Sequence, residues 1–336
     1  MALQSQTVLI TGATGFMGNC LVRRFHREGA HVIAAGRTAS SKGDCFPHGV
    51  HAVDMDITIP DTLPPVSKDA EIIIHAAAKV GDWGKEQEFM ETSRDGTKNL
   101  LNAVNKQKLR QFIYISSVAV YGEHREGVVT EDLIANAYSY PYAAAKAAAE
   151  EVAMHFYRSY DIPLTIIRPA NIYGPGSVVW TDRPAEIIRK GLMNLPKGFG
   201  KSNTVFVENV VEGIVCACNS PGAIGETFNI SDDFLLGWDE FFLNYASVFG
   251  KKKIRVLPVW LMKSMARSME YMSRLTGKPP LITRTAIDFL RFQGTYSIEK
   301  AQELLNYRPP FNREKAFEIT REYLRTKYAT MPQGEV

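Results

Sequence analysis

The sequence has few cysteines, and none of them forms a recognisable pair. Its 336 residues include Cys20, Cys45, Cys216 and Cys218. None of their spacings matches a zinc site, and the single residue between Cys216 and Cys218 is not the spacing of a CxxC redox pair. We therefore expect no metal site and no disulfide framework. A reducing compartment, the cytoplasm, is the expected location.

The chain also lacks the features of secreted, membrane-spanning and nucleic-acid-binding proteins. It contains no run of about 18 apolar residues, so we expect no membrane span. A segment typical of a buried strand begins at Thr7, which leaves no room for a cleavable signal peptide. The 39 basic and 36 acidic residues nearly balance, with a formal net charge of +3. We therefore expect a small molecule, and not a nucleic acid, as the partner.

The sequence does contain short apolar segments that alternate with helical segments. Such strands are typical of a parallel sheet covered by helices on both faces. The strands are expected at residues 7–11, 31–35, 71–75, 112–116 and 164–167, and the helices at residues 16–28, 85–107 and 142–160. This order predicts an α/β fold with a doubly wound parallel sheet.

The alternation weakens after a segment rich in proline and glycine, residues 173–176. We expect the scattered helices and strands beyond it to form a smaller C-terminal lobe over the carboxyl ends of the sheet strands, where ligands of open α/β sheets bind. The sheet domain is assigned residues 1–176 and 203–231. The substrate-binding lobe is assigned residues 177–202 and 232–336.

Three glycines lie between the first predicted strand and the first predicted helix. Gly12 suits a tight turn, Gly15 lets the backbone approach a pyrophosphate, and Gly18 lets helix and strand pack closely. The helix N-terminus offers amide donors and a positive dipole end to the phosphates. The spacing is one residue wider than the common GxGxxG, and glycines also serve turns that bind nothing. Their position after a strand and before a helix predicts a dinucleotide-binding loop.

The residue after the second predicted strand indicates which nucleotide binds. An acid at this point would bind a free ribose 2′-hydroxyl, but the segment contains Arg37, and the first acid beyond it is Asp44. A guanidinium forms charge-assisted hydrogen bonds with a 2′-phosphate. We therefore expect NADP to be preferred over NAD, unless Arg37 is only a solvated surface residue. Asp56 and Ile57 are expected to contact the adenine, although Asp56 could instead cap a helix.

A serine, a tyrosine and a lysine form the candidate catalytic group. Ser117 follows a predicted strand, and Tyr142 and Lys146 lie four residues apart on one face of a predicted helix. Such a tyrosine can transfer a proton to or from a carbinol oxygen during hydride transfer. Its pKa must then fall from about 10 to about 7, and one cation about 4 Å away supplies roughly that effect. Lys146 and an oxidised nicotinamide would provide the charge, and Ser117 would hold the substrate oxygen.

Taken together, these motifs resemble the extended short-chain dehydrogenase/reductase family, also called the NAD-dependent epimerase/dehydratase type. The matching segments are residues 11–18, 75–78, 96–99, 116–122, 168–174, 206–210 and 225–230, with Tyr142 and Lys146. The resemblance implies a Rossmann-type sheet that binds NAD(P), with Ser117, Tyr142 and Lys146 as the catalytic residues. It also implies that Pro169 and Ile172 lie against the nicotinamide and Asn171 near the substrate.

Within the family the sequence is most similar to the 3β-hydroxysteroid dehydrogenase-like branch, which includes bacterial reductases of long 3-oxo acids. Residues 79–84, 275–280 and 296–301 carry this similarity. Ser93 departs from the family pattern, because an asparagine usually stands there and makes a structural or proton-relay hydrogen bond. Serine can still donate and accept such a bond.

The expected contacts follow from the motifs and from the resemblance. His75 is expected to be a buried histidine with satisfied hydrogen bonds, and the three alanines after it leave room for a flat cofactor. The cofactor is expected to contact Gly12, Thr14, Gly15, Phe16, Met17, Gly18, Arg37, Asp56, Ile57, Ala76, Ala77, Ala78, Ser116, Tyr142, Lys146, Pro169 and Ile172. The substrate is expected to contact Lys79, Trp83, Val118, Tyr138, Asn171 and Trp180. Helices 85–107 and 142–160 could form a homodimer, as in many relatives.

One amphipathic segment of the expected lobe is rich in methionine. Its apolar side contains Met262, Met265, Ala266, Met269, Met272 and Leu275. Packing inside the lobe is the simpler interpretation, because methionine fills irregular apolar spaces. The alternative is that this side, with Trp83 and Trp180, forms the wall of a pocket for a steroid-like or long-chain ketone. The basic side, with Lys263, Arg267 and Arg274, would then contact a membrane surface.

These features lead to three functional hypotheses. The first is an NADP-dependent oxidoreductase that interconverts a secondary alcohol and a ketone on a small lipophilic substrate. The second is a nucleotide-sugar epimerase or dehydratase with tightly bound NAD. Arg37 argues against it, and Arg183, Arg189 and Lys190 show no obvious clustering around a diphosphate. The third is a non-catalytic NADP(H)-binding sensor or scaffold, against which the complete catalytic group argues.

Overall fold

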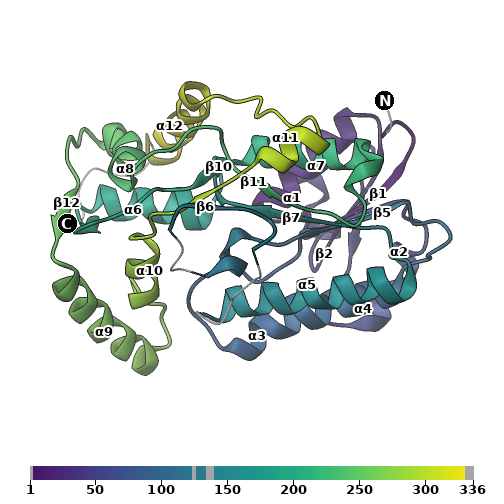
Figure 1. Cartoon of the computed structure of the whole chain (residues 1–336), viewed down its shortest axis with the longest axis horizontal. Coiled ribbons are helices and arrows are strands. Elements are labelled where there is room, and N and C mark those ends of the chain that lie inside the picture. The colour runs from purple at the N-terminus through teal and green to yellow at the C-terminus, as the bar shows by residue number, and fades with distance from the viewer. Residues whose placement is uncertain (1–2, 123–125, 134–139, 330–336) are drawn as a thin grey trace.

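Mostly apolar strands form a seven-stranded parallel sheet at the centre of the molecule (Figure 1). The structure is a computed structural model that describes residues 3–122, 126–133 and 140–329. The strand order is β11-β7-β5-β4-β1-β2-β3. The strands are β1 (Thr7–Thr11), β2 (His31–Gly36), β3 (His51–Asp54), β4 (Ile72–His75), β5 (Gln111–Ile115), β7 (Leu164–Pro169) and β11 (Thr227–Ile230).

Helices cover both faces of this sheet, because successive side chains of each strand point to opposite sides. In β1, Val8 and Ile10 belong to one apolar cluster, whereas Leu9 belongs to the other. The first face carries α1 (Phe16–Arg27), α7 (Val207–Asn219) and α11 (Glu299–Leu304), which lie above the sheet in Figure 1. The opposite face carries α2 (Pro64–Ser67), α3 (Glu86–Met90), α4 (Gly96–Ala103) and α5 (Pro141–Tyr160).

The strand order creates a crevice beside β1. The chain leaves β1 toward β2 and β3 on one side, and later returns to β4 on the other side of β1. The connections after β1 and β4 therefore diverge at the carboxyl ends of these strands, which is where open α/β sheets bind ligands. The predicted doubly wound parallel sheet is confirmed.

One predicted helix differs from the structure. The expected helix 85–107 is divided into α3 and α4 by a π-helical turn at Glu91–Asp95, and α4 ends at Ala103. The hydroxyl of Thr97, in α4, donates to the carbonyl oxygen of Ser93 in this turn at 2.5 Å. A π-helical turn inserts an extra residue without changing the apolar periodicity enough to reveal it. Such turns often lie at functional sites, and this one packs against α5.

The second half of the chain forms most of the lobe, around a cluster of aromatic side chains. Trp238, Phe241 and Tyr245 are fully buried, and Phe317 packs against them. The lobe helices are α6 (Arg183–Arg189), α8 (Trp238–Ala246), α9 (Val259–Thr276), α10 (Arg284–Phe289) and α12 (Arg313–Ala329). The paired short strands are β8 (Asn171–Tyr173) with β10 (Thr204–Phe206), β9 (Asn194–Pro196) with β12 (Arg255–Leu257), and β6 (Val128–Val129) with β13 (Thr295–Tyr296).

One C-terminal segment of the chain packs on the sheet and not in the lobe. Ala301, Leu305 and Tyr307 are buried in the apolar cluster on the first face of the sheet, together with α1 and α7. Tyr307 lies close to the end of β11, with its hydroxyl 3.5 Å from the carbonyl oxygen of Ser231. Late segments therefore complete the sheet core, and the two halves of the chain pack as one structure.

The cysteines occur as free thiols in the fold. Burial raises the pKa of Cys20 to about 12 and the pKa of Cys216 to about 11. Both thiols are therefore protonated at neutral pH and are poor nucleophiles. No helix in the described part of the chain is long and apolar enough to cross a membrane. The same residues contain no group of three or more His, Cys, Asp or Glu side chains arranged to hold a metal ion.

Candidate active site

A cavity of about 960 Å³ extends from the carboxyl ends of the sheet strands into the lobe. It brings together Ser117 and all seventeen residues that the sequence predicted to contact the cofactor. Of the predicted substrate contacts, Lys79, Val118, Asn171 and Trp180 also line it. The wall next to the sheet is therefore built from the ends of several strands, as expected for a doubly wound fold.

The glycine loop lies directly between β1 and α1. Gly12 has a φ of +70°, and a Cβ atom there would lie 2.9 Å from the backbone nitrogen of Ala77. A Cβ atom at Gly18 would overlap the carbonyl oxygen of Gly12. Gly15 precedes α1 in an extended conformation and offers no side-chain cap, so the first amide groups of α1 point toward the cavity without an internal acceptor. Any larger side chain at these positions would close the cradle.

These residues fit a bound dinucleotide. The cradle exposes the N-terminus of a twelve-residue helix, where phosphates are favoured. Further along the cavity wall the Ser116 side chain is buried, and its hydroxyl has no hydrogen-bond partner among the described residues. A buried hydroxyl without a partner costs free energy, and a polar group of the nicotinamide end would relieve that cost. Gly12, Gly15, Gly18 and Ser116 would therefore hold the cofactor when it binds.

Arg37 lines the cavity at an exposed position just after β2. Its guanidinium makes no ion pair with a carboxylate of the described residues. Asp56 lies nearby, but its Oδ1 already accepts hydrogen bonds from the amide and the hydroxyl of Thr58, at 2.9 Å and 2.8 Å. Asp56 therefore closes a local turn of the kind typical of Asx residues while still lining the cavity. Ile57 is buried against Gly96.

The candidate catalytic side chains meet at the middle of the cavity. Ser117 lies two residues beyond β5, and its hydroxyl accepts a hydrogen bond from the amide of Ala119 at 3.2 Å. Tyr142 lies in the first turn of α5, which begins at Pro141, and Lys146 lies one turn later on the same helix. The Lys146 ammonium donates to the carbonyl oxygen of Ile115 at 2.6 Å. This bond ties α5 to the end of β5.

Burial dominates the electrostatics of this group. It raises the pKa of Tyr142 above its usual value, while the hydrogen bond with Ser117 acts in the opposite direction. Burial also lowers the pKa of Lys146 to about 7, and the carboxylate of Glu150 opposes that change. Lys146 alone therefore does not bring the pKa of Tyr142 to neutrality. A further positive charge is needed, as an oxidised nicotinamide would supply.

A buried polar network, which the sequence did not reveal, lies one turn further along α5 from Lys146. Arg168 of β7 donates to both carboxylate oxygens of Glu150, at 2.9 Å and 2.6 Å. It also donates to the Tyr121 hydroxyl at 2.8 Å, and that hydroxyl donates to Asn229 at 2.8 Å. The network joins α5, β7, β11 and the turn after Ser117. Two oppositely charged residues 18 positions apart gave no signal in the sequence, because only the fold brings them together.

Two neighbouring polar residues have structural roles. His75 is fully buried between the hydroxyls of Thr11 and Thr97, at 2.8 Å and 3.1 Å. Burial lowers its pKa to about 3, so the ring is neutral, which agrees with the sequence expectation. Ser93, where the family usually has asparagine, is buried with no partner for its hydroxyl among the described residues. The shorter side chain therefore does not replace the asparagine bond.

Two predicted substrate contacts are not part of the described cavity. Trp83 is half-buried and is not among the residues that line it, so its contact with the substrate stays a prediction. It lies between Gly81 and Gly84, whose φ angles are +137° and +147°. The Asp82 carboxylate accepts a hydrogen bond from Thr283 at 2.6 Å, which fixes this loop against the start of α10. Tyr138 lies outside the described residues.

The wall formed by the lobe is predominantly apolar, and the sequence identified only part of it. Trp180 stacks on Trp238, with ring centroids 5.3 Å apart. Met262, Met265 and Met269 line the cavity, whereas Met272 and Leu275 face solvent. Helical periodicity identifies an apolar side but not which part of it faces a cavity. The remaining apolar lining includes Val178, Val179, Ile187, Leu192, Phe242, Leu257, Ile282, Phe289 and Leu290.

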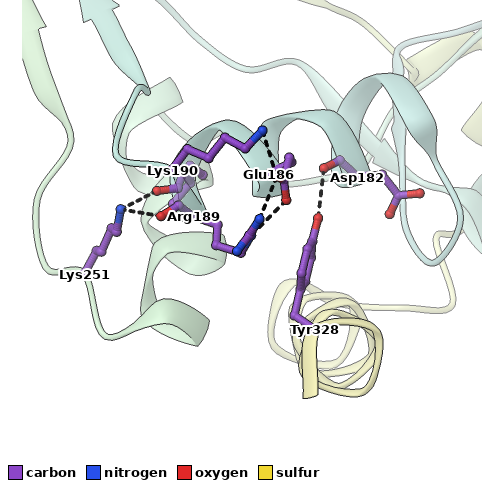
Figure 2. A network of polar contacts seen from close by, with 7 residues as sticks. Asp182, Glu186, Arg189, Lys190, Lys251 and Tyr328 are labelled. Atoms are coloured by element: carbon purple, nitrogen blue, oxygen red, sulfur yellow. Dashed lines mark hydrogen bonds and ion pairs between the residues drawn. The ribbon is translucent and has the colours of Figure 1, made fainter. Parts of the chain in front are cut away.

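The cations of α6 are engaged in local contacts. Figure 2 shows Arg189 and Lys190 reaching Glu186, and Lys251 donating to the carbonyl oxygens at the end of the helix. Arg189 and Lys190 do not line the cavity. Arg183 does, but its guanidinium donates to the carbonyl oxygens of Pro280 and Leu281. The three candidate diphosphate ligands therefore do not converge.

Comparisons with known proteins agree with this geometry. The family model described as "NAD dependent epimerase/dehydratase family" matches residues 8–231. A 2-alkyl-3-oxoalkanoate reductase of Stenotrophomonas maltophilia is 27% identical, across 92% of this chain and 96% of its own. A UDP-glucose 4-epimerase of Vibrio cholerae is 26% identical, across 94% of each chain. The crystal structure of a Bacillus cereus UDP-glucuronic acid 4-epimerase with NAD superposes with a TM-score of 0.74, at 23% identity, across 96% of this chain and 100% of that one.

Proposed function

The chain belongs to the NAD dependent epimerase/dehydratase family, that is, to the extended short-chain dehydrogenases/reductases, and on this premise we propose that it interconverts a secondary alcohol and a ketone on a lipophilic substrate. Membership makes it an NAD(P)-dependent enzyme. The kind of substrate and the choice of NADP are the proposal.

The apolar lobe wall is the observation that carries this proposal. A nucleotide sugar would need cations directed at its diphosphate. In the lobe lining of the described residues Arg183 is the one cation, and its Nη2 already donates to two backbone carbonyls. A long-chain or steroid-like ketone would instead bury its hydrocarbon against Trp180, Met269 and their apolar neighbours, at about 25 cal/mol per Å².

The catalytic residues suit proton transfer at a carbonyl oxygen. The nicotinamide supplies or accepts the hydride when it is bound. The Tyr142 hydroxyl gives its proton to the carbonyl oxygen during reduction and takes it back during oxidation. Ser117 donates to the same oxygen as charge develops on it. Lys146, fixed by Ile115, lowers the energy of the tyrosinate by its charge.

We expect Arg37→Asp to reverse the cofactor preference. The exposed guanidinium would hold the 2′-phosphate, and a charge-assisted hydrogen bond contributes roughly 1.5–3 kcal/mol. Its loss weakens NADPH binding by about tenfold to a hundredfold, and the new carboxylate can accept from the free hydroxyl of NADH. Titration of both cofactors, followed by fluorescence, measures the change. Lys42→Asp, an equal charge change outside the cavity lining, is the control. A wild-type protein that prefers NADH would contradict the proposal.

A substrate panel tests the proposed chemistry. NADPH oxidation is measured with 3-oxosteroids, long-chain 3-oxo acids and UDP-sugars, and epimerisation of the sugars is followed by chromatography. We expect turnover of at least one lipophilic ketone and none of the sugars. Turnover confined to the sugars would show that the second hypothesis is correct. Cofactor binding with no turnover in any class would favour the sensor.

The location and the assembly state are also proposed. The free thiols favour the cytoplasm. A homodimer through α4 and α5 would follow the arrangement that the family resemblance implies, and sedimentation velocity would test it.

A further inference from the structure

The outer side of α9 is apolar although it faces solvent. This helix lies at one end of the molecule, at the lower left of Figure 1. Trp260, Tyr271, Met272 and Leu275 are 70%, 64%, 54% and 66% exposed. At about 3.6 residues per turn these four side chains fall within one third of the helix circumference. Large apolar side chains gathered on one exposed side mark an interaction surface.

The serine and threonine hydroxyls on this side already donate hydrogen bonds within α9. The Ser264 and Ser268 hydroxyls donate to the carbonyl oxygens four residues earlier, at 2.9 Å and 3.2 Å. Thr276 does the same to the carbonyl oxygen of Met272, at 3.0 Å. Hydroxyls satisfied by their own helix can enter an apolar medium without an unpaired donor. The outer side of α9 can therefore be buried at little polar cost.

The surrounding segment is strongly basic. Residues 251–278 contain eight lysines and arginines and one acid, Glu270, whereas the whole chain has a formal net charge of only +3. Glu270 is buried and paired with Arg284 at 2.9 Å. Of the α9 cations, only Lys263 has an ion-pair partner among the described residues. Arg267 and Arg274 are exposed along one edge of the apolar side.

The same helix forms part of the cavity wall. Met265 and Met269 lie on the edge of α9 opposite to these arginines and line the cavity. Leu281, just beyond α9, also lines the cavity and is 40% exposed. One helix, α9, therefore carries both the outer apolar side, which faces solvent, and, along one edge of that side, part of the cavity wall.

We propose that α9 docks on an anionic lipid surface and lies in the plane of the membrane interface. Its outer side chains enter the boundary between headgroups and acyl chains, with Trp260 and Tyr271 at the headgroup level. Arg267, Arg274 and Lys278 contact the lipid phosphates. A second copy of the chain is a poorer occupant, because two such basic segments placed face to face repel each other. This docking goes beyond the proposed function and does not rest on it.

Vesicle sedimentation of the full-length protein, without substrate, tests the proposal. We expect binding to vesicles of phosphatidylcholine with phosphatidylglycerol, weaker binding at high salt, and little binding to phosphatidylcholine alone. Each cation near an anionic surface contributes about 1 kcal/mol, so Arg267→Glu/Arg274→Glu should bind at least about tenfold more weakly. Trp260→Ser/Leu275→Ser should also lose binding. Lys42→Glu/Lys68→Glu, with exposed cations elsewhere, should bind like the wild type.

Two further measurements keep the result unambiguous. Thermal unfolding checks that the variants remain folded, which we expect because every changed side chain is exposed or half-buried. The emission of exposed Trp260 should shift to the blue on anionic vesicles, and Trp260→Phe should abolish the shift. Equal binding to both vesicle types, or arginine variants that bind normally, would overturn the proposal. So would loss of a dimer in Trp260→Ser/Leu275→Ser without any vesicle binding, since that would identify a second copy as the occupant.

Discussion

Tyr142→Phe is expected to lower kcat by roughly 10²–10⁴-fold, the usual contribution of a positioned general acid or base. The ring would stay in place, because it packs against Phe89 and stacks on Tyr140 with centroids 6.5 Å and 6.2 Å away. The change therefore removes the proton carrier but not the cavity wall. NADPH affinity, measured by fluorescence titration, should change little, so that the loss appears in kcat.

Tyr140→Phe is the matched control for this change. It removes the hydroxyl of the neighbouring ring, which also lines the cavity. We expect this variant to keep most of its activity, because Tyr140 precedes α5 and no lysine lies four residues after it. If Tyr142→Phe retained most of the turnover on an established substrate, Tyr142 would not be the proton carrier.

Arg168→Met is expected to lower the free energy of unfolding by about 3–5 kcal/mol. The change leaves the Glu150 carboxylate buried without its cation, and a broken buried ion pair typically costs that amount. The Tyr121 hydroxyl loses its donor as well. Urea unfolding monitored by circular dichroism gives the difference.

Two further variants distinguish the loss of stability caused by the unpaired buried charge from the loss caused by the missing packing. Glu150→Gln/Arg168→Met removes both charges, and we expect it to be more stable than Arg168→Met alone. Lys315→Met breaks an exposed ion pair with Glu318 and should change stability by less than about 1 kcal/mol. If Arg168→Met were as mild as Lys315→Met, the buried network of Arg168 would not stabilise the fold.

The cofactor half of the site could be predicted from the sequence because local chain geometry carries the signal. Gly12 has a φ of +70°, which favours glycine, and Gly18 lies where a Cβ atom would overlap the carbonyl oxygen of Gly12, six residues earlier. Ser117 follows a strand, and Lys146 lies within a helix, that the local sequence specifies. Parallel strands end at one edge of a sheet, so residues that follow different strands meet there without any knowledge of long-range contacts.

The substrate half could not be predicted in the same way, because distant segments decide it. Trp83 was expected in the cavity, but its neighbours Gly81 and Asp82 line it instead, and a hydrogen bond that spans 201 positions, from Thr283 to Asp82, holds this loop. The side of α9 was recognised as apolar, yet only the packed lobe shows that Met269 lines a cavity while Leu275 meets solvent. The π-helical turn at Ser93 leaves the apolar periodicity nearly intact.

The return of the chain to the sheet bears on how the protein folds during synthesis. Ala301, Leu305 and Tyr307 fill the core on one face of the sheet beside α1 and α7. The sheet strands themselves are all made by residue 230. The nascent sheet must therefore wait for about one quarter of the chain to emerge from the ribosome before its core closes. Until then the part of the apolar face that these residues fill stays uncovered, and apolar surface exposed in this way makes a folding chain prone to aggregation.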